Sequence, residues 1–167
     1  MAFFYSFKWL PLIFAAASLI TIASADQALI NSICAKARNH ALCHQVLNSV
    51  TADRGGLGQI STNVALAKAQ NALNLVKTLA QKASDPRTKD QYKTCLEEYG
   101  DALDDLQESK AAFGKNDFGT ANIKASAADT DVDTCSDDGP NVAPQLKAAN
   151  QENADYIDIV LAVSNLN

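Results

Sequence analysis

The 167-residue sequence has few of the side chains on which enzymes commonly depend. It contains two histidines, His40 and His44, and it lacks the Gly-x-Ser-x-Gly motif of a nucleophile elbow. The glycine-rich segment at residues 55–58 lacks the Gly-Lys-Ser/Thr ending of a phosphate-binding loop. No Glu-x-x-His pair is present to build a di-metal centre inside a helical bundle. These absences predict a protein that is not an enzyme and that binds no cofactor.

The sequence also offers little support for a metal site. His40, Cys43 and His44 have a spacing that resembles a set of metal ligands. Structural zinc, however, normally requires four ligands and reduced thiols. We therefore expect two exposed histidines beside an oxidised cysteine, and no bound metal.

Long apolar runs are confined to the first 25 residues. Lys8 precedes an apolar stretch from Leu10 to Ile22, which ends in the small residues Ala23–Ala25. This order is typical of a secretory signal peptide, and the apolar stretch is shorter than the roughly 20 residues that span a bilayer. We predict a signal peptide over residues 1–25, a secreted mature chain over residues 26–167, and no membrane association after cleavage. An uncleaved membrane anchor is the less favoured alternative.

Positive charge is also scarce. The formal net charge is −5 for the full sequence. It becomes −6 for the mature chain, because the first 25 residues carry one positive charge, Lys8, and no negative charge. An acidic protein is poorly suited to the phosphates of nucleic acids. It is better suited to a basic protein partner, because complementary charge speeds encounter and fixes orientation.

The mature sequence shows helical periodicity and no strand-like alternation. It predicts a helical hairpin over residues 26–50 with a turn near Arg38–Asn39, followed by a polar linker, so that residues 26–56 form an extension to the main domain. Asp85 and Asp117 are candidate N-caps, and Pro86 is suited to a first helical position. Residues 136–140 are expected to end the third long helix. The long helices are expected at residues 57–83, 86–113, 118–135 and 144–166. The predicted fold class is therefore all-α, with an up-down-up-down four-helix bundle over residues 57–167.

Two of the expected helices have apolar stripes that can be compared. The stripe of the second long helix is the clearest in the chain, and we expect it to be buried. It consists of Tyr92, Cys95, Leu96, Tyr99, Ala102, Leu103, Leu106 and Phe113. The first long helix is expected to carry its apolar residues near one side, as an amphipathic helix of the bundle. These are Leu57, Ile60, Val64, Ala67, Leu75 and Leu79.

Four cysteines follow the predicted signal peptide: Cys34, Cys43, Cys95 and Cys135. Secretion would place them in an oxidising compartment, so two disulfides are expected. Four cysteines allow three pairings, and the sequence alone does not choose among them. A Cys34–Cys43 bond would suit a short helical hairpin, which leaves Cys95 and Cys135 for the second bond.

The second long helix also carries an acidic face. Its members lie three and four residues apart, on the side away from the apolar stripe. They are Glu97, Asp101, Asp104, Asp105 and Glu108, with Glu98 beside them. This face is either an ordinary solvated surface or a recognition surface for a basic or polar cleft, and composition does not decide between the two.

Several segments resemble the plant pectin methylesterase inhibitor and invertase inhibitor family. The resemblance extends over essentially the whole mature chain and includes the cysteines in their local contexts. The matching segments are Ile33–Cys34 with the short spacing to Cys43, Asp85–Pro86, Tyr92–Tyr99, Asp101–Leu106, Ala125–Ala128, Asp133–Cys135 and Asp158–Leu166. The resemblance implies a four-helix bundle with an N-terminal hairpin, and disulfides that pair first with second and third with fourth cysteine.

The resemblance also implies a function. Family members inhibit an enzyme by forming a stoichiometric complex that covers its substrate cleft. For this chain, with its predicted signal peptide, we expect action outside the cell, in the apoplast or cell wall. In pectin methylesterase inhibitors the contact surface uses the acidic face of the second bundle helix and the end of the third. Carried onto this sequence, the partner-binding residues are Glu97, Asp101, Asp104, Thr134 and Asp137.

Within the family, two targets are expected. The segments at residues 56–59 and 164–166 are more similar to pectin methylesterase inhibitors, and no Pro-Lys-Phe-like element of invertase inhibitors is present. We therefore expect pectin methylesterase as the partner, with cell-wall or vacuolar invertase as the alternative. Ile157 occupies the position of an unpaired cysteine found in some relatives, so a monomer is expected before complex formation.

Overall fold

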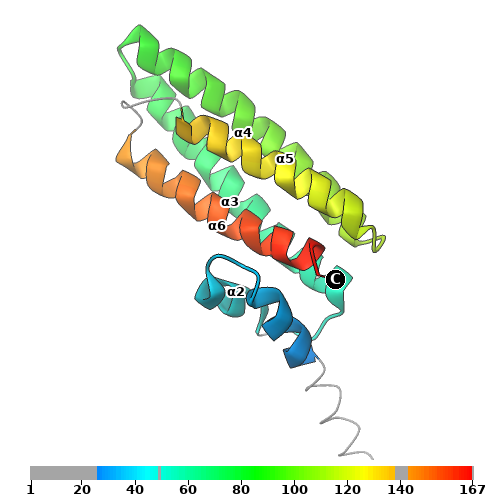
Figure 1. The fold of residues 1–167 in the computed structure, drawn as a ribbon. Coiled ribbons are helices and arrows are strands. Elements are labelled where there is room, and N and C mark those ends of the chain that lie inside the picture. The colour runs from blue at the N-terminus through cyan, green and yellow to red at the C-terminus, as the bar shows by residue number, and fades with distance from the viewer. Residues whose placement is uncertain (1–25, 49, 138–142, 167) are drawn as a thin grey trace, which may run out of the picture.

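The computed structural model describes residues 26–48, 50–137 and 143–166 (Figure 1). The described residues form helices joined by short turns, and no strand occurs among them. The expected signal peptide lies outside the described residues, as does most of the break expected at residues 136–140. Ser136 and Asp137 still belong to the preceding helix.

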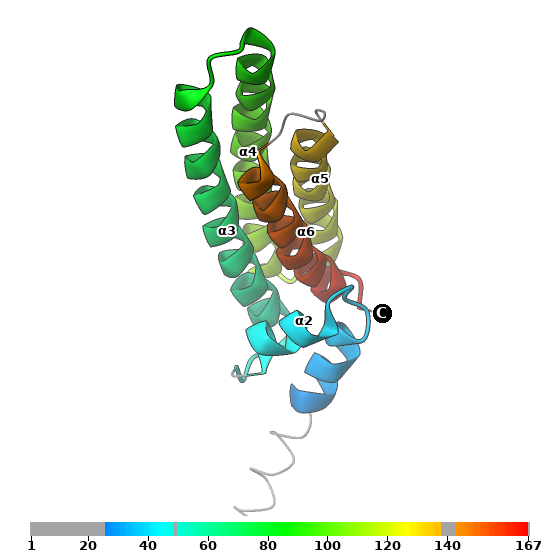
Figure 2. The same ribbon diagram turned by 90° about the vertical axis from the view of Figure 1, so that its left-hand side faces the viewer.

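Four long helices form a closed bundle. They are α3 (Arg54–Lys82), α4 (Pro86–Phe113), α5 (Phe118–Asp137) and α6 (Pro144–Ser164). Each runs antiparallel to the helix before it (Figures 1 and 2). Helix α3 packs against α4 and α6, and α5 also packs against α4 and α6, so the four helices enclose one core. The predicted all-α, up-down-up-down bundle is confirmed.

Aspartate side chains begin three of the long helices. The carboxylates of Asp85 and Asp117 accept hydrogen bonds from the backbone N–H groups of Thr88 at 2.9 Å and Thr120 at 3.0 Å, as expected for N-caps. Asp53 was not expected to do the same, but its carboxylate accepts a hydrogen bond from the N–H of Gly56 at 2.8 Å. Helix α3 therefore begins at Arg54, three residues before the predicted start.

The core confirms one predicted stripe and contradicts the other. In α4 the predicted positions are buried, except that Leu96 and Leu103 are half-buried. In α3 only Leu57 of the six predicted residues is buried, and Ala67 is exposed. The buried face of α3 is made instead of small side chains, which let the neighbouring helices approach closely. They are Gly55, Gly58, Ser61, Thr62, Ala65, Ala69 and Ala72, with Val76 near the far end.

The N-terminal hairpin lies at the end of the bundle where α3 begins and α6 ends (Figures 1 and 2). It consists of a helix over residues 26–34 and of α2 (His40–Leu47), with Asn39 accepting a hydrogen bond from the N–H of Leu42. The Cys34–Cys43 disulfide joins its two helices. Ile30, Ile33 and Leu47 are buried and extend the bundle core into the hairpin.

Arg54 connects the ends of three helices at the end of the bundle that carries the hairpin. Its guanidinium lies over the ring of Phe118, with 3.8 Å between Cζ and the ring centroid. It also donates hydrogen bonds to the carbonyl oxygens of Val163 at 2.9 Å and Ser164 at 2.6 Å. A cation is favoured at this position because the last carbonyls of a helix carry partial negative charge. The starts of α3 and α5 are thereby held against the end of α6.

Candidate functional site: the acidic face of α4 and the outer face of α5

Three of the predicted partner-binding residues lie together on the outer face of α4. Glu97, Asp101 and Asp104 are exposed, on the side of the helix opposite the buried Tyr99 and Leu106. The carboxylate of Glu97 lies 3.8 Å from the ammonium of Lys93, one turn earlier, and its side chain remains 67% exposed. An exposed pair of this kind contributes little to stability. These carboxylates are therefore available to another molecule.

Two other carboxylates of the predicted acidic face contact the neighbouring helix. Lys124 of α5 places its ammonium 2.9 Å from Asp105 Oδ1 and 2.8 Å from Glu108 Oε2. Hydrogen bonds to these two carboxylates raise the pKa of Lys124 above its ordinary value. Asp105 and Glu108 thus fix the register of α4 against α5, and the sequence did not reveal this pairing.

Asp131 of α5 faces the same acidic side of α4. One of its oxygens, Oδ2, is buried and has no hydrogen-bond partner among the described residues. Desolvation raises the pKa of Asp131 to about 6, and the negative charges of Glu98, Asp105 and Asp101 add to that shift. Asp131 lies seven residues after Lys124, which places both side chains on the same side of α5. That spacing was the signal in the sequence that could have identified it.

Thr134 lies on the outer face of α5, near its end. The side chain is exposed, and its hydroxyl donates a hydrogen bond to the carbonyl of Thr130 at 2.9 Å. The neighbouring Cys135 is bonded to Cys95 of α4, with 4.7 Å between the two Cα atoms. This disulfide brings Thr134 to the level of Glu97. Asp137 is the last residue of α5, and its side chain lies outside what the structure describes.

A buried hydrogen bond lies in the core behind the exposed carboxylates of α4. The hydroxyl of Tyr99 donates a hydrogen bond to Asn150 Oδ1 of α6 at 2.7 Å, and both residues are buried. Asn150 Nδ2 lies 3.6 Å from Cys135 Sγ. Burial raises the pKa of the Tyr99 phenol, so its proton stays available for this bond. The disulfide and the hydrogen bond together connect α4, α5 and α6 under the exposed carboxylates.

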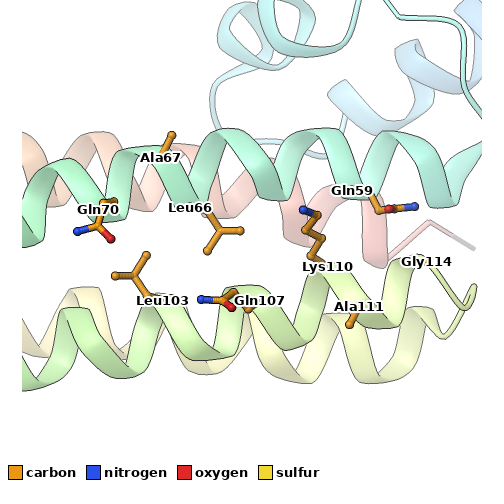
Figure 3. Close-up of a pocket in the computed structure, with 9 residues that line it drawn as sticks. All are labelled: Gln59, Leu66, Ala67, Gln70, Leu103, Gln107, Lys110, Ala111 and Gly114. Carbon is orange, nitrogen blue, oxygen red and sulfur yellow. The ribbon is translucent and has the colours of Figure 1, made fainter.

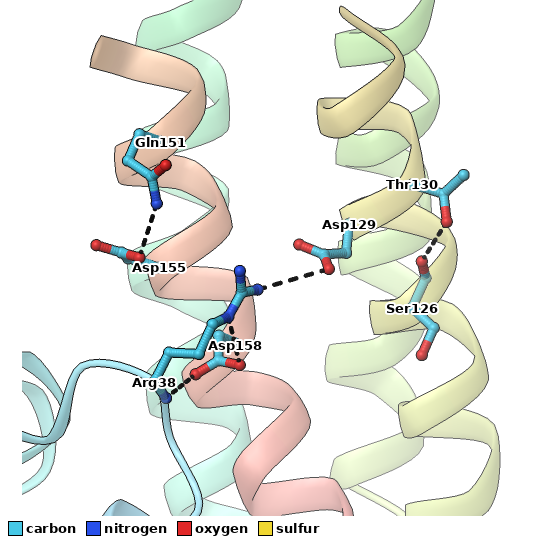
Figure 4. A network of polar contacts seen from close by, with 7 residues as sticks. All are labelled: Arg38, Ser126, Asp129, Thr130, Gln151, Asp155 and Asp158. Atoms are coloured by element: carbon cyan, nitrogen blue, oxygen red, sulfur yellow. Dashed lines mark hydrogen bonds and ion pairs between the residues drawn. The ribbon is translucent and has the colours of Figure 1, made fainter. Parts of the chain in front are cut away.

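A second polar network anchors the hairpin on the other side of α5 (Figure 4). The backbone N–H of Arg38 donates to Asp158 Oδ2 at 2.6 Å, and its Nε donates to Asp158 Oδ1 at 3.1 Å. Its Nη2 lies 3.8 Å from Asp129 Oδ2. Desolvation and the negative charge of Asp133 raise the pKa of Asp129, although Arg38 opposes the shift. The hydrogen bonds of this network join residues 120 positions apart, and no sequence motif predicted them.

A groove lies on the opposite flank of α4, between α3 and α4 (Figure 3). Its volume is about 620 Å³. Leu66 from α3 and Leu103 from α4 point into it, and amide side chains lie along its edges (Figure 3). Lys110 is the one titratable residue of its lining. A lysine without a neighbouring acid, base or nucleophile does not make a catalytic constellation.

Clusters of metal ligands and membrane-spanning helices are both absent from the described residues. Nowhere in the described ranges do three or more potential metal ligands come together. His44 Nδ1 lies 3.2 Å from Asn48 Oδ1, and Cys43 is in a disulfide. None of the helices in the described part of the chain combines the length and apolar character needed to cross a bilayer.

Comparisons with known proteins identify the family to which this chain is similar. The model of the "Plant invertase/pectin methylesterase inhibitor" family matches residues 28–163. A "Pectinesterase inhibitor" from Actinidia deliciosa is 40% identical over 149 residues, which cover 85% of this chain and 80% of that protein. A "Putative invertase inhibitor" from Platanus acerifolia is 33% identical over 121 residues, which cover 71% of this chain and 68% of that protein.

The fold agrees with these sequence comparisons. The crystal structure of a mutant form of a pectin methylesterase inhibitor from Arabidopsis superposes with a TM-score of 0.74 at 27% identity. The match covers 82% of this chain and 95% of that one. The chain therefore belongs to the plant invertase/pectin methylesterase inhibitor family, a family of inhibitors and not of enzymes.

Proposed function

We propose that this protein is a secreted inhibitor of pectin methylesterase, which it binds in a stoichiometric complex that occludes the enzyme's substrate cleft. The observation that carries the proposal is the exposed row of Glu97, Asp101 and Asp104 on α4, with Thr134 beside it on α5. Identity of 40% to a protein named "Pectinesterase inhibitor" supports the choice of target. Asp137, at the end of α5, is proposed to complete the contact surface.

The rigidity of this surface supports inhibition by steric occlusion. The four residues stand on two helices that the Cys95–Cys135 disulfide joins, and Lys124 connects the same helices through Asp105. A contact surface that is ordered before binding loses little conformational entropy in the complex. The carboxylates steer the approach of a basic or hydroxyl-rich cleft and fix its orientation, while the bundle behind them excludes the substrate.

The compartment and the oligomeric state belong to the same proposal. Two disulfides persist in an oxidising environment, which agrees with export through a signal peptide over residues 1–25 into the apoplast or cell wall. The mature inhibitor domain over residues 26–167 is proposed to be monomeric until it meets its enzyme. All four cysteines are used within the chain, and none remains free among the described residues to link two copies.

An invertase is the second candidate target. The observation that favours it is 33% identity to a protein named "Putative invertase inhibitor". One fold can serve two targets, because the fold does not determine which enzyme the surface fits.

A titration distinguishes the two candidates. Increasing amounts of the mature protein are added to a plant pectin methylesterase, and methanol release from methylesterified pectin is measured. In parallel, sucrose hydrolysis is measured with a cell-wall and a vacuolar invertase. We expect methanol release to stop near an equimolar ratio while sucrose hydrolysis continues. Inhibition of invertase alone would replace the first candidate by the second, and full activity of several isoforms of both enzymes would refute both.

A further inference from the structure

The outer face of α5 carries an unusual apolar side chain. Ile123 is 69% exposed, and no other large hydrophobic side chain of the described residues is exposed. One exposed apolar residue is ordinary on a protein surface. Ile123 is of interest because its neighbours on the same face of α5 are also uncharged.

Ile123, Ala127, Thr130 and Thr134 form one strip along α5, which we call the α5 strip. Their spacing of four, three and four residues places them on the same face of the helix. That face lies opposite the core-facing positions, where Ala121, Ala125, Ala128, Val132 and Cys135 are buried. At about 1.5 Å per residue, the strip is about 16 Å long.

The two threonines contribute methyl groups to this strip. The hydroxyl of Thr130 donates to the carbonyl of Ser126 at 3.0 Å (Figure 4), and that of Thr134 donates to the carbonyl of Thr130 at 2.9 Å. A threonine hydroxyl bonded to its own helix is turned toward the backbone. The γ-methyl group is then the outward part of the side chain. The α5 strip is therefore uncharged and largely apolar from Ile123 to Thr134.

Carboxylates border the strip on both sides. On the α4 side lie Asp105 and Glu108, held by Lys124 immediately after Ile123, and beyond them the exposed acidic row of α4. On the α6 side lie the exposed Asp133 and the half-buried Asp129. An apolar centre with a polar rim is the usual composition of a protein–protein interface.

We propose that the α5 strip is the apolar centre of the docking surface for pectin methylesterase, with the acidic row of α4 as part of its rim. The proposal rests on the proposed function and adds to it the residues that hold the complex together. The partner is the substrate cleft of pectin methylesterase, the target that 40% identity to a protein named "Pectinesterase inhibitor" supports. The substrate of such an enzyme is a polyuronide chain in which charged carboxylates and apolar methyl esters occur side by side. The α4 carboxylates and the α5 strip present the same two kinds of group together.

The two parts of the surface have separable roles. Side chains in the desolvated centre of an interface contribute most of the affinity and act mainly on the dissociation rate. Charges at the rim act mainly on the association rate and on its dependence on salt. Ile123→Ser is therefore expected to raise the dissociation rate, whereas Asp101→Asn is expected to lower the association rate at low salt.

The test measures association and dissociation rates of a plant pectin methylesterase with immobilised variants at two salt concentrations. For Ile123→Ser we expect Kd to rise about tenfold to a hundredfold, as for a central contact residue. Ile123→Val, which keeps an apolar side chain, is the control and should stay within a few-fold of the wild type. Unchanged circular dichroism establishes that each variant is folded, as the exposure of the Ile123 side chain leads us to expect.

Thr130 provides a second test that does not involve Ile123. Thr130→Val keeps the γ-methyl group and replaces the hydroxyl by a second methyl group, so binding should be retained. Thr130→Ser keeps the hydroxyl and removes the methyl group, so binding should weaken. The opposite order would show that the enzyme contacts a polar helix face and would overturn the proposal. If the wild type binds and Ile123→Ser binds equally well, the α5 strip is excluded while the proposed function stands; failure of the wild type to bind several isoforms would reject the proposed function itself.

Discussion

Replacing glycine by alanine is predicted to change the stability of the protein in opposite directions at two positions of the bundle helices. Gly58 lies in α3 at the point where that helix meets α4. A Cβ atom added there would overlap the ring atoms Cγ, Cδ1 and Cε1 of Phe113. The ring has no room to withdraw, because Phe113 is 1% exposed and packs edge-on against Phe118 with 6.2 Å between ring centroids. Gly100 lies in α4, and an added Cβ would meet nothing within 4 Å.

The expected magnitudes follow from two opposing contributions. Alanine is favoured over glycine in a helix interior by about 1 kcal/mol. Overpacking a core costs about 1–3 kcal/mol, and the upper end applies at Gly58 because the added atom would lie inside a fixed ring. Gly58→Ala should therefore lower the free energy of unfolding by about 2 kcal/mol. Gly100→Ala should raise it by about 0.5–1 kcal/mol, since only the helix preference applies there.

Urea denaturation of the mature chain with its disulfides intact measures both values. The two variants differ from the wild type by the same methyl group, so each is the control for the other. In thermal unfolding the same difference corresponds to a fall of about 8 °C for Gly58→Ala, at about 4 °C for each kcal/mol. A Gly58→Ala variant as stable as the wild type would refute the close packing of α3 on Phe113.

Three further predictions concern charge, the hairpin and the second disulfide. The pKa of Asp131, about 6 in the folded state, lies above its ordinary value of 3.8, so ionisation of this carboxyl destabilises the folded state. The effect is absent below about pH 4, grows as pH rises, and is complete above about pH 6, neutrality included. Asp131→Asn should therefore stabilise the protein more near pH 7 than near pH 4 in urea denaturation, and an equal effect at the two pH values would contradict the assignment. Asp158→Ala removes the acceptor of two hydrogen bonds from Arg38 and should cost about 1.5–3 kcal/mol; faster amide hydrogen exchange in the hairpin is the expected sign, and unchanged exchange there would exclude this anchor. Replacing Cys95 and Cys135 by serine opens a link across 40 residues and should cost about 4 kcal/mol; a loss below about 1 kcal/mol would show that the link contributes little to the rigidity of the site.

Local signals were sufficient to predict most of the fold. Helix α4 was predictable because large apolar residues recur at helical spacing and because Asp85 and Pro86 mark its start. Helix α3 was predicted as a helix, but its buried face was misassigned. Residues such as Ala65 and Ala69 face the core because close helix contact requires small side chains, whereas periodicity gives most weight to large ones.

The candidate site was predictable only in part. The exposed carboxylates of α4 stood out because they repeat along one helix and depend on no other element. The contacts of Asp105 with Lys124, and of Arg38 with Asp158, depend on how neighbouring helices are rotated and aligned. The spacing of residues within one helix does not contain that information. The outward methyl group of Thr130 was equally hidden, since it depends on the direction of a hydroxyl group.

The central claim is that the α4 and α5 face of this bundle binds and covers an enzyme. Hydrogen–deuterium exchange of the mature protein, measured alone and with an equimolar plant pectin methylesterase, tests it most directly. We expect slower exchange over residues 97–108 and 123–137 in the mixture, and unchanged exchange along the groove between α3 and α4. Protection confined to the hairpin or to that groove, or no protection under conditions of full inhibition, would contradict the claim.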